Sequence, residues 1–209
     1  MLEAEIVAGS GMKLACTRNE LVAKLGIVSR ALSSRSAVQI LSGVFLRAEN
    51  GELQLAATDM ELSLRTSLNA QVEGDGAVVV QGRLLVELAR LLPEDDVQIE
   101  HRSEEGIVEI TCGTASYRLH TYSAEDFPRL PDVQAAPLHT VDGEALLATV
   151  AQVSRAASRD ESRPVLTGIL VQLEGEKLVM AATDSYRLSV KETQLKSAAP
   201  SPLNAGRPD

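Results

Sequence analysis

Arginines at recurring positions are the residues of this chain best suited to bind a ligand. Arg30 and Arg155 both lie in the tripeptide Ser-Arg-Ala, 125 positions apart, and Arg83 and Arg90 are seven positions apart in a leucine-rich segment. A guanidinium group carries a permanent charge and a planar fork of N–H donors that matches phosphate oxygens. The pattern therefore indicates a surface that binds phosphates, although solvated surface charges would look the same at any one of these positions.

Two aspartates could in principle hold a metal ion. Asp59 and Asp184 each end the tetrapeptide Ala-Ala-Thr-Asp, and a duplication explains them better than a shared ion does. We expect each side chain to accept hydrogen bonds from backbone N–H groups in a local turn. The three histidines, His101, His120 and His139, are scattered, and the chain has no phosphate-cradling G-x-x-x-x-G-K-[ST] loop, H-E-x-x-H motif or paired-cysteine motif. We therefore expect no enzyme active site, no metal site and no cofactor.

Both sets of residues belong to an internal duplication. When residues 17–65 are aligned without gaps on residues 142–190, 15 of 49 positions are identical. The period of 125 residues is much longer than the 20 to 50 residues of solenoid repeats. Each copy is therefore expected to be a structural unit of its own.

The arginines are expected to lie on three helices. A helix over residues 19–33 places four apolar side chains in one stripe at 100° per residue, and its repeat places four more. These inward residues are Leu21, Leu25, Val28 and Leu32 in the first copy and Leu146, Val150, Val153 and Ala157 in the second. A third helix over residues 83–92 is expected to bury Leu84, Leu88 and Leu91, which leaves Arg83 and Arg90 on one flank.

Alternating apolar and polar residues between the helices predict strands. These strands lie at 44–48, 53–57, 61–68, 77–81, 107–112 and 116–121. The order is strand, helix and three strands, followed by the same order again, which indicates the α+β class. Most acids fall in turns or at strand ends, so the charges are segregated by element.

The composition is that of a soluble globular protein with two domains. The chain has 209 residues, of which 44% are hydrophobic, and no stretch approaches the roughly 20 apolar residues of a membrane span. Its first residues carry acids where a signal peptide needs basic groups, so we expect a cytoplasmic location. Cys16 and Cys112 are expected to be reduced and buried. The net charge of −9 disfavours nucleic acid on average, but the placement of the basic groups matters more than the average.

Four segments resemble the bacterial DNA polymerase III β sliding clamp family. They are ILSGVFL followed by AATDMELSL, VVVQGRLLVELARLLP, SAEDFPRLP, and VLTGIL followed by AATDSYRLSV, in the order and spacing of the family. The resemblance implies a DNA-clamp fold of duplicated β-α-β-β-β units, with helices lining a central hole and antiparallel sheets outside. It also implies a homodimeric ring around duplex DNA that gives the polymerase processivity without a catalytic site of its own.

The resemblance implies two kinds of binding residue. The candidate contacts to duplex DNA are Arg35, Arg30, Arg83, Arg90, Arg155, Arg159 and Arg163. The candidate pocket for a short linear motif consists of Leu166, Thr183, Ser185, Tyr186, Arg187 and Leu188. Through this pocket the family docks polymerase III subunits, the clamp loader, other polymerases and repair proteins. No membrane partner is implied.

The resemblance also divides the chain. Residues 1–11 are expected to be an extension or a start-site artefact, residues 12–123 the first clamp domain, residues 124–137 a linker, and residues 138–209 a shortened second domain. We expect no third domain within these residues and therefore no closed ring from this chain alone, and we expect unpaired strand edges in its second domain.

Two other functional classes remain open. One is a β-rich interaction module without DNA contacts, for which Arg35, Arg83 and Arg90 would point in unrelated directions. The other is a metal-dependent nucleic-acid enzyme, which would need carboxylates gathered around a metal ion.

Overall fold

Two compact units make up the chain. The computed structural model describes residues 11–33, 38–93, 95–130 and 139–197. Unit 1 is Met1–Pro131 and unit 2 is Asp132–Asp209. Each unit has its own hydrophobic core.

Unit 1 contains the β-α-β-β-β order twice. The first half consists of β1 (Lys13–Thr17), α1 (Arg18–Val28), β2 (Gly43–Glu49), β3 (Glu52–Thr58), β4 (Ser63–Asn69) and β5 (Gln71–Gly74). The second half consists of β6 (Gly76–Gln81), α2 (Gly82–Leu91), β7 (Asp96–Arg102), β8 (Ile107–Cys112) and β9 (Ala115–Tyr122). Since only Ala70 separates β4 from β5, the two act as one long strand with a bend. The predicted duplication of β-α-β-β-β units is confirmed.

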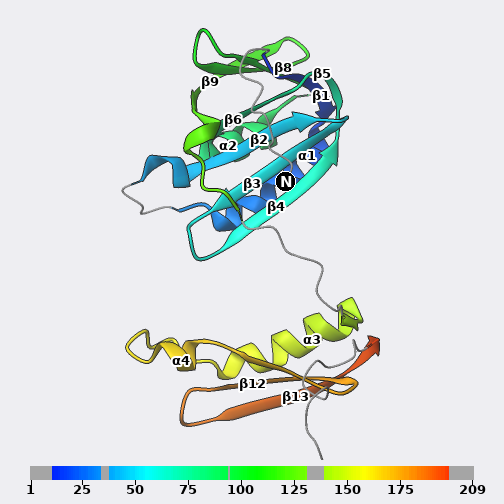
Figure 1. Cartoon of the computed structure of the whole chain (residues 1–209), viewed down its shortest axis with the longest axis vertical. Coiled ribbons are helices and arrows are strands. Elements are labelled where there is room, and N and C mark those ends of the chain that lie inside the picture. Colours follow the sequence, from blue (N-terminus) through cyan, green and yellow to red (C-terminus); the bar gives the residue numbers. More distant parts are fainter. Residues whose placement is uncertain (1–10, 34–37, 94, 131–138, 198–209) are drawn as a thin grey trace, which may run out of the picture. The chain divides into compact units, whose positions relative to one another are not determined.

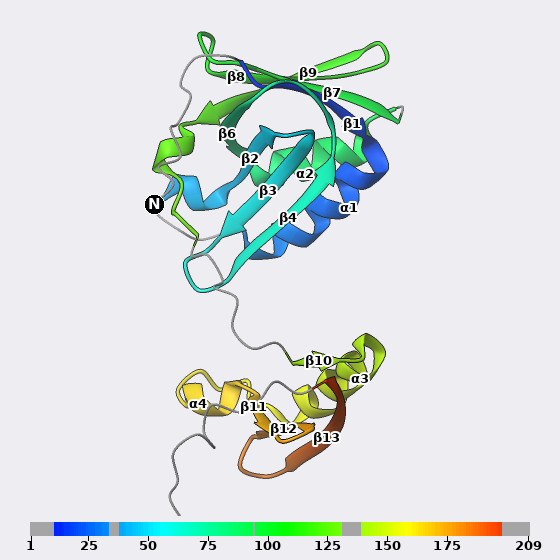
Figure 2. The ribbon, with the colours of Figure 1, turned by 45° about the vertical axis from the view of Figure 1, so that its right-hand side comes forward.

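The strands of unit 1 form one antiparallel sheet in the order β4-β3-β2-β6-β9-β8-β7-β1-β5. Its two halves join reciprocally, because β2 pairs with β6 and β1 pairs with β7. The sheet curves around α1 and α2, which lie side by side (Figures 1 and 2). One face of the sheet therefore packs on the helices, and the other face points away from them.

Helix α1 buries the residues that its sequence pattern predicts, but it is shorter than predicted. Leu21, Leu25 and Val28 are fully buried in the core of unit 1. The α-helix ends at Val28 and continues as a 3-10 turn, η1 (Ser29–Ala31). Leu32 follows in an extended conformation and is half-buried, so the predicted helical end at residue 33 is wrong.

Helix α2 is rotated relative to the prediction. Leu84 and Leu91 were expected inside but are 48% and 76% exposed, whereas Leu85 and Ala89 are buried. Gly82, the first residue of α2, permits this orientation, because a Cβ atom there would lie 2.6 Å from a methyl carbon of Leu32. The side of α2 that carries residues 82, 85 and 89 therefore packs on the core. The leucines on the other side of α2 are left at the surface.

Unit 2 repeats the β-α-β-β-β order once within the described residues. It consists of β10 (Thr140–Val141), α3 (Gly143–Val153), η4 (Ser154–Ala156), α4 (Pro164–Thr167), β11 (Leu170–Glu174), β12 (Lys177–Thr183) and β13 (Leu188–Ser197). Its sheet order, β10-β13-β12-β11, reproduces the order β1-β5/β4-β3-β2 of unit 1. In unit 1 the edge of β2 is covered by β6, whereas no strand among the described residues pairs with the outer edge of β11. All five residues of β11 are exposed.

A small core holds α3 against the sheet of unit 2 (Figure 1). Val153 is fully buried, and the predicted inward residues Leu146, Val150 and Ala157 pack against it as half-buried side chains. Thr149 on α3 also turns inward, where its hydroxyl lies 2.5 Å from that of Thr193 on β13. Because both hydroxyls are buried, this contact satisfies groups that would otherwise be desolvated without a partner.

Unit 1 extends beyond the boundary predicted at residue 123. The segment after β9 forms a 3-10 turn, η3 (Ala124–Asp126), and then returns to the sheet. Phe127 is 8% exposed and belongs to a cluster with Ala56 and Val79, and its ring centroid lies 5.1 Å from that of Phe45. This aromatic contact fixes the first part of the predicted linker to unit 1.

Both cysteines are buried, as predicted. Cys16 lies on β1 and Cys112 on β8, and neither forms a disulfide. Burial, which disfavours the thiolate, raises the pKa of Cys16 to about 12. The thiol therefore behaves as a small core side chain.

Several predicted features lie outside the described residues. They are Arg35, the extension over residues 1–11 apart from Gly11, residues 131–137 of the linker, and residues 198–209 of the second domain. Within the described ranges, no helix is both long enough and apolar enough to cross a membrane.

Candidate functional site

The exposed side of the helices in unit 1 carries three of the predicted DNA-binding arginines. Arg30 lies in the 3-10 turn after α1, and Arg83 and Arg90 lie on α2. All three are exposed, because the opposite sides of the two helices pack into the core. Arg83 and Arg90 are seven residues apart, so they lie nearly in line along one side of α2.

This side of unit 1 is basic, although the whole chain is acidic. Residues 18–31 and 82–91 contain five basic and two acidic residues, whereas the chain has a net charge of −9. Arg83 forms an exposed ion pair with Glu87, at 3.2 Å between Nε and Oε1. Within the described part of the chain, no ion pair of Arg30 or Arg90 with an acidic side chain occurs, so their guanidinium groups can meet an external anion.

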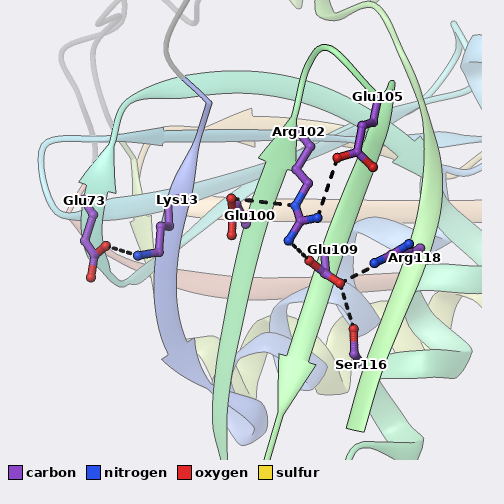
Figure 3. A network of polar contacts seen from close by, with 8 residues as sticks. All are labelled: Lys13, Glu73, Glu100, Arg102, Glu105, Glu109, Ser116 and Arg118. Atoms are coloured by element: carbon purple, nitrogen blue, oxygen red, sulfur yellow. Dashed lines mark hydrogen bonds and ion pairs between the residues drawn. The ribbon is translucent and has the colours of Figure 1, made fainter.

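On the other face of the sheet, arginines are paired with acids (Figure 3). Glu109 in β8 follows the core residue Val108 and therefore points away from the helices. Its carboxylate contacts the guanidinium of Arg102, accepts a hydrogen bond from Ser116 Oγ at 2.9 Å and lies 3.3 Å from Arg118 Nε. The Ser116 hydrogen bond and the two guanidinium groups hold the pKa of Glu109 below its usual range. These arginines are already neutralised within the protein.

Unit 2 contains a cleft of about 490 Å³ between the segment that follows α3 and the turn that joins β12 to β13. It is lined by Ser154, Arg155, Ala157, Ser158, Arg159, Asp160, Arg163, Asp184, Tyr186 and Arg187. Four arginines against two aspartates make the cleft basic. Tyr186 is 93% exposed and offers an aromatic surface with a polar tip.

Backbone and side-chain hydrogen bonds fix the wall of this cleft. The Ser158 N–H donates to the Leu166 carbonyl at 2.8 Å, which closes the segment between them into a loop. In this loop, Arg163 Nε donates to Asp160 Oδ2 at 3.0 Å. Arg163 Nη1 also lies 3.4 Å from Ser185 Oγ, so the loop reaches the β12–β13 turn. A residue predicted to bind DNA thus lies beside one predicted to bind a peptide.

The β12–β13 turn is held by Thr183 and Asp184. The Asp184 Oδ1 atom accepts hydrogen bonds from the N–H groups of Tyr186 and Arg187, both at 3.0 Å. The Thr183 hydroxyl accepts from the Ser185 N–H at 3.1 Å and donates to the Arg187 carbonyl at 2.7 Å. These bonds hold Ser185 at a φ of +79°. The Arg187 Nε atom donates to Asp184 Oδ2 at 2.9 Å, whereas the Tyr186 side chain is exposed at the tip of the turn.

Unit 1 has the same turn with different side chains at its tip. The Asp59 Oδ1 atom accepts from the N–H groups of Glu61 and Leu62, at 3.0 and 2.7 Å, and the Thr58 hydroxyl accepts from the Met60 N–H at 3.0 Å. Met60 has a φ of +78°, which matches Ser185. The predicted structural role of the two Thr-Asp pairs is therefore confirmed.

Both aspartates are held as carboxylates by these turns. The N–H groups of Leu62 and Glu61 lower the pKa of Asp59, and those of Tyr186 and Arg187 lower the pKa of Asp184. Each carboxylate therefore stabilises its turn above the ordinary aspartate pKa of about 3.9, and this contribution is lost as the pH falls through the lowered value. Asp59 and Asp184 lie in different units. No group of three or more His, Cys, Asp or Glu side chains in the described ranges is arranged to hold a metal ion.

The other predicted residues of unit 2 lie around the cleft. Arg155 occupies η4 in the position that Arg30 occupies in η1, and both are exposed. Leu166 is half-buried in α4 and is not in the cleft lining, whereas Leu188 begins β13 and is 67% exposed. The turn, α4 and the loop before it therefore bring the predicted peptide residues into one region of unit 2.

Comparison with known proteins assigns the family. Residues 12–131 match the DNA polymerase III beta subunit N-terminal domain, and residues 140–205 match the central domain of the same subunit. The chain belongs to the DNA polymerase III beta-subunit family. Its match to the N-terminal domain covers both halves of unit 1, and its match to the central domain begins at β10.

Individual members of the beta-subunit family are similar over most of this chain. The beta sliding clamp of Micrococcus luteus is 40% identical over 91% of this chain and 60% of its own length. The beta sliding clamp of Streptomyces coelicolor is 38% identical over 90% of this chain and 50% of its own length. A crystal structure of the sliding clamp of Bartonella birtlesii bound to griselimycin has a TM-score of 0.81 and 29% identity, over 88% of this chain and 50% of that one. The chain thus spans half to three fifths of the length of these relatives.

Proposed function

We propose that this chain acts in a β sliding clamp, a ring that encircles duplex DNA and keeps the replicative polymerase on its template. In this role α1, α2 and α3 face the DNA, and the sheets face outward. The function is tethering, so it needs no active site. Ring closure prevents escape, while contacts to phosphates that do not depend on base sequence allow sliding.

The distribution of arginines in unit 1 is the observation that carries this proposal. Arg30 and Arg90 on the helical side have no ion pair with a described acid. On the far side of the sheet, Arg102 and Arg118 both pair with Glu109, and Arg102 also pairs with Glu100 and Glu105. Family membership alone does not say which face binds DNA. The unpaired positive charge supports the helical face, since a polyanion binds where basic groups are not already neutralised.

A binding measurement tests the DNA contact. We expect the chain to bind two duplexes of unrelated sequence with equal affinity at about 50 mM salt, and to lose affinity steeply as salt rises, because phosphate contacts release counterions. Fluorescence anisotropy with labelled duplexes measures both effects. A marked preference for one sequence, or no binding at low salt, would contradict the proposal.

We also propose that the cleft of unit 2 docks short peptide segments of polymerases, the clamp loader and repair proteins. Tyrosine and arginine side chains are frequent hot spots of such interfaces, and the cleft presents Tyr186 and Arg187 from a turn that is fixed by hydrogen bonds. A preformed cleft lowers the cost of ordering a flexible peptide. Griselimycin, which is bound to the Bartonella birtlesii clamp in its crystal structure, is the ligand that we propose for testing this cleft.

The two copies of the turn provide a matched pair of variants for docking. We expect Tyr186→Ala to weaken griselimycin binding by about tenfold or more, as loss of an aromatic anchor does. Glu61→Ala, at the equivalent position of unit 1, should leave binding unchanged. Isothermal titration calorimetry on both variants measures the difference. Equal effects of the two substitutions would place the ligand elsewhere.

A further inference from the structure

A side chain from the start of α1 caps the end of α2. Arg18 is the first residue of α1, and its guanidinium donates to two carbonyls in the last turn of α2. The Nη2 atom lies 2.7 Å from the Arg90 carbonyl oxygen, and Nε lies 3.4 Å from that of Ala89. The Arg18 N–H donates in addition to the Asp95 carbonyl at 2.7 Å, so this end of α1 is bound to the segment that follows α2.

The end of α2 needs this donor. The last carbonyls of a helix have no partner inside it, and the residue four positions after Ala89 is Pro93, which has no N–H to donate. The residue that follows the helix, Leu92, leaves the helical conformation, with φ −58° and ψ 134°. Arg18 therefore gives the Ala89 carbonyl a hydrogen bond that Pro93 cannot provide.

The position of Arg18 is unusual for a basic residue. A positive charge in the first turn of a helix is unfavourable next to the helix dipole, and the two other long helices, α2 and α3, begin with Gly82 and Gly143 after their N-caps. An arginine is therefore not required to start this type of helix. At Arg18 the unfavourable position is offset because its charge meets the negative end of α2.

We infer that Arg18 is a positioning residue for DNA binding, which acts through the last turn of α2 and hence through Arg90. The inference rests on the proposed function. Arg18 bonds the Arg90 carbonyl while the Arg90 side chain is exposed on the basic side of unit 1. A turn held in this way keeps the Arg90 guanidinium in place for a phosphate. When the turn frays, the charge remains but its position is no longer fixed.

A double-mutant cycle tests the inference. The variants are Arg18→Met, Arg90→Ala and the combination, and Arg47→Met is the control because Arg47 pairs with Glu49 on β2, away from α2. Arg18→Met should speed amide hydrogen exchange in the last turn of α2 and weaken duplex binding about two- to fivefold. The slope of log affinity against log salt should fall by no more than the loss of one phosphate contact, about 0.9. In the Arg90→Ala background it should have almost no further effect on affinity. Arg47→Met should change neither exchange in α2 nor affinity by a comparable amount.

A conservative variant keeps the inference testable if Arg18→Met folds poorly. Arg18→Lys retains the charge but can reach only part of the two-carbonyl contact, so exchange and affinity should fall between those of the unaltered chain and Arg18→Met. Equal weakening by Arg18→Met with and without Arg90 would mean that Arg18 contacts DNA itself, which overturns the inference. Unchanged exchange in α2 would also overturn it. If the unaltered chain does not bind duplex DNA, the proposed function is overturned as well. If the unaltered chain binds and Arg18→Met binds equally well, only this inference is overturned.

Discussion

Leu25→Ala is expected to lower the free energy of unfolding of unit 1 by about 2 to 5 kcal/mol. Leu25 is fully buried between α1 and the sheet, in the core cluster of unit 1. Its truncation removes apolar contacts and leaves a cavity that a curved sheet on one side and α2 on the other can fill only in part. Denaturant unfolding followed by circular dichroism measures the loss.

The same helix provides the control for this variant. Ile27 is 43% exposed, so Ile27→Ala removes a side chain of the same size from a position that keeps much of its contact with water. We expect a loss of less than about 1 kcal/mol. Similar losses for the two substitutions would mean that α1 does not pack as described.

The combined variant Arg30→Ala, Arg83→Ala, Arg90→Ala is expected to weaken duplex binding about ten- to a hundredfold at low salt. Each arginine that contacts a phosphate adds about 0.9 to the slope of log affinity against log salt, so the slope should fall by roughly two to three. Anisotropy titrations over a range of salt concentrations measure the affinity and the slope together.

A second triple variant separates the site from the charge. Lys13→Ala, Arg47→Ala, Arg118→Ala removes the same number of positive charges from the side of the sheet that faces away from the helices, where each pairs with an acid. Glu109 keeps its contacts with Arg102 and Ser116 in this variant. We expect a much smaller loss of affinity. An equal loss would mean that total charge, and not the helical side of unit 1, determines binding.

Repetition made much of the fold predictable from the sequence. The ungapped alignment of the two copies places α1 on α3 and β3 on β12. In the structure the helices follow the same strand in both copies, and the strands have the same order in the two sheets. The tetrapeptide Ala-Ala-Thr-Asp predicted a turn because threonine and aspartate side chains bond the backbone N–H groups that follow them, and both turns form in this way. Local chemistry repeated at a fixed offset was enough for these elements.

The rotation of α2 was not predictable from its pattern. Leucines occur on both sides of this helix, so the 3.6-residue period does not choose between Leu84 and Leu85 as the inward residue. The choice depends on how closely Gly82 approaches Leu32, a contact between residues 50 positions apart in the sequence. Tertiary packing of this kind has no local signal.

Two features of the candidate site were missed for the same reason. Arg163 was assigned to DNA from its place in the sequence, but its contact with Ser185 depends on how the loop after α3 folds onto the β12–β13 turn. The sequence pattern gave Arg18 no role. An arginine in the first turn of one helix, and a proline just after the end of another, were the available signals, but only the structure brings them together.

Site-specific photo-crosslinking to duplex DNA tests the central claim most directly. A photoreactive residue at Ala23 would lie on the exposed side of α1, in line with Arg30, and one at Gln98 would lie on β7 on the side away from the core. We predict that duplex DNA crosslinks from Ala23 and not from Gln98. Crosslinking from Gln98, or equally from both positions, would contradict the claim that the helices of unit 1 face the DNA.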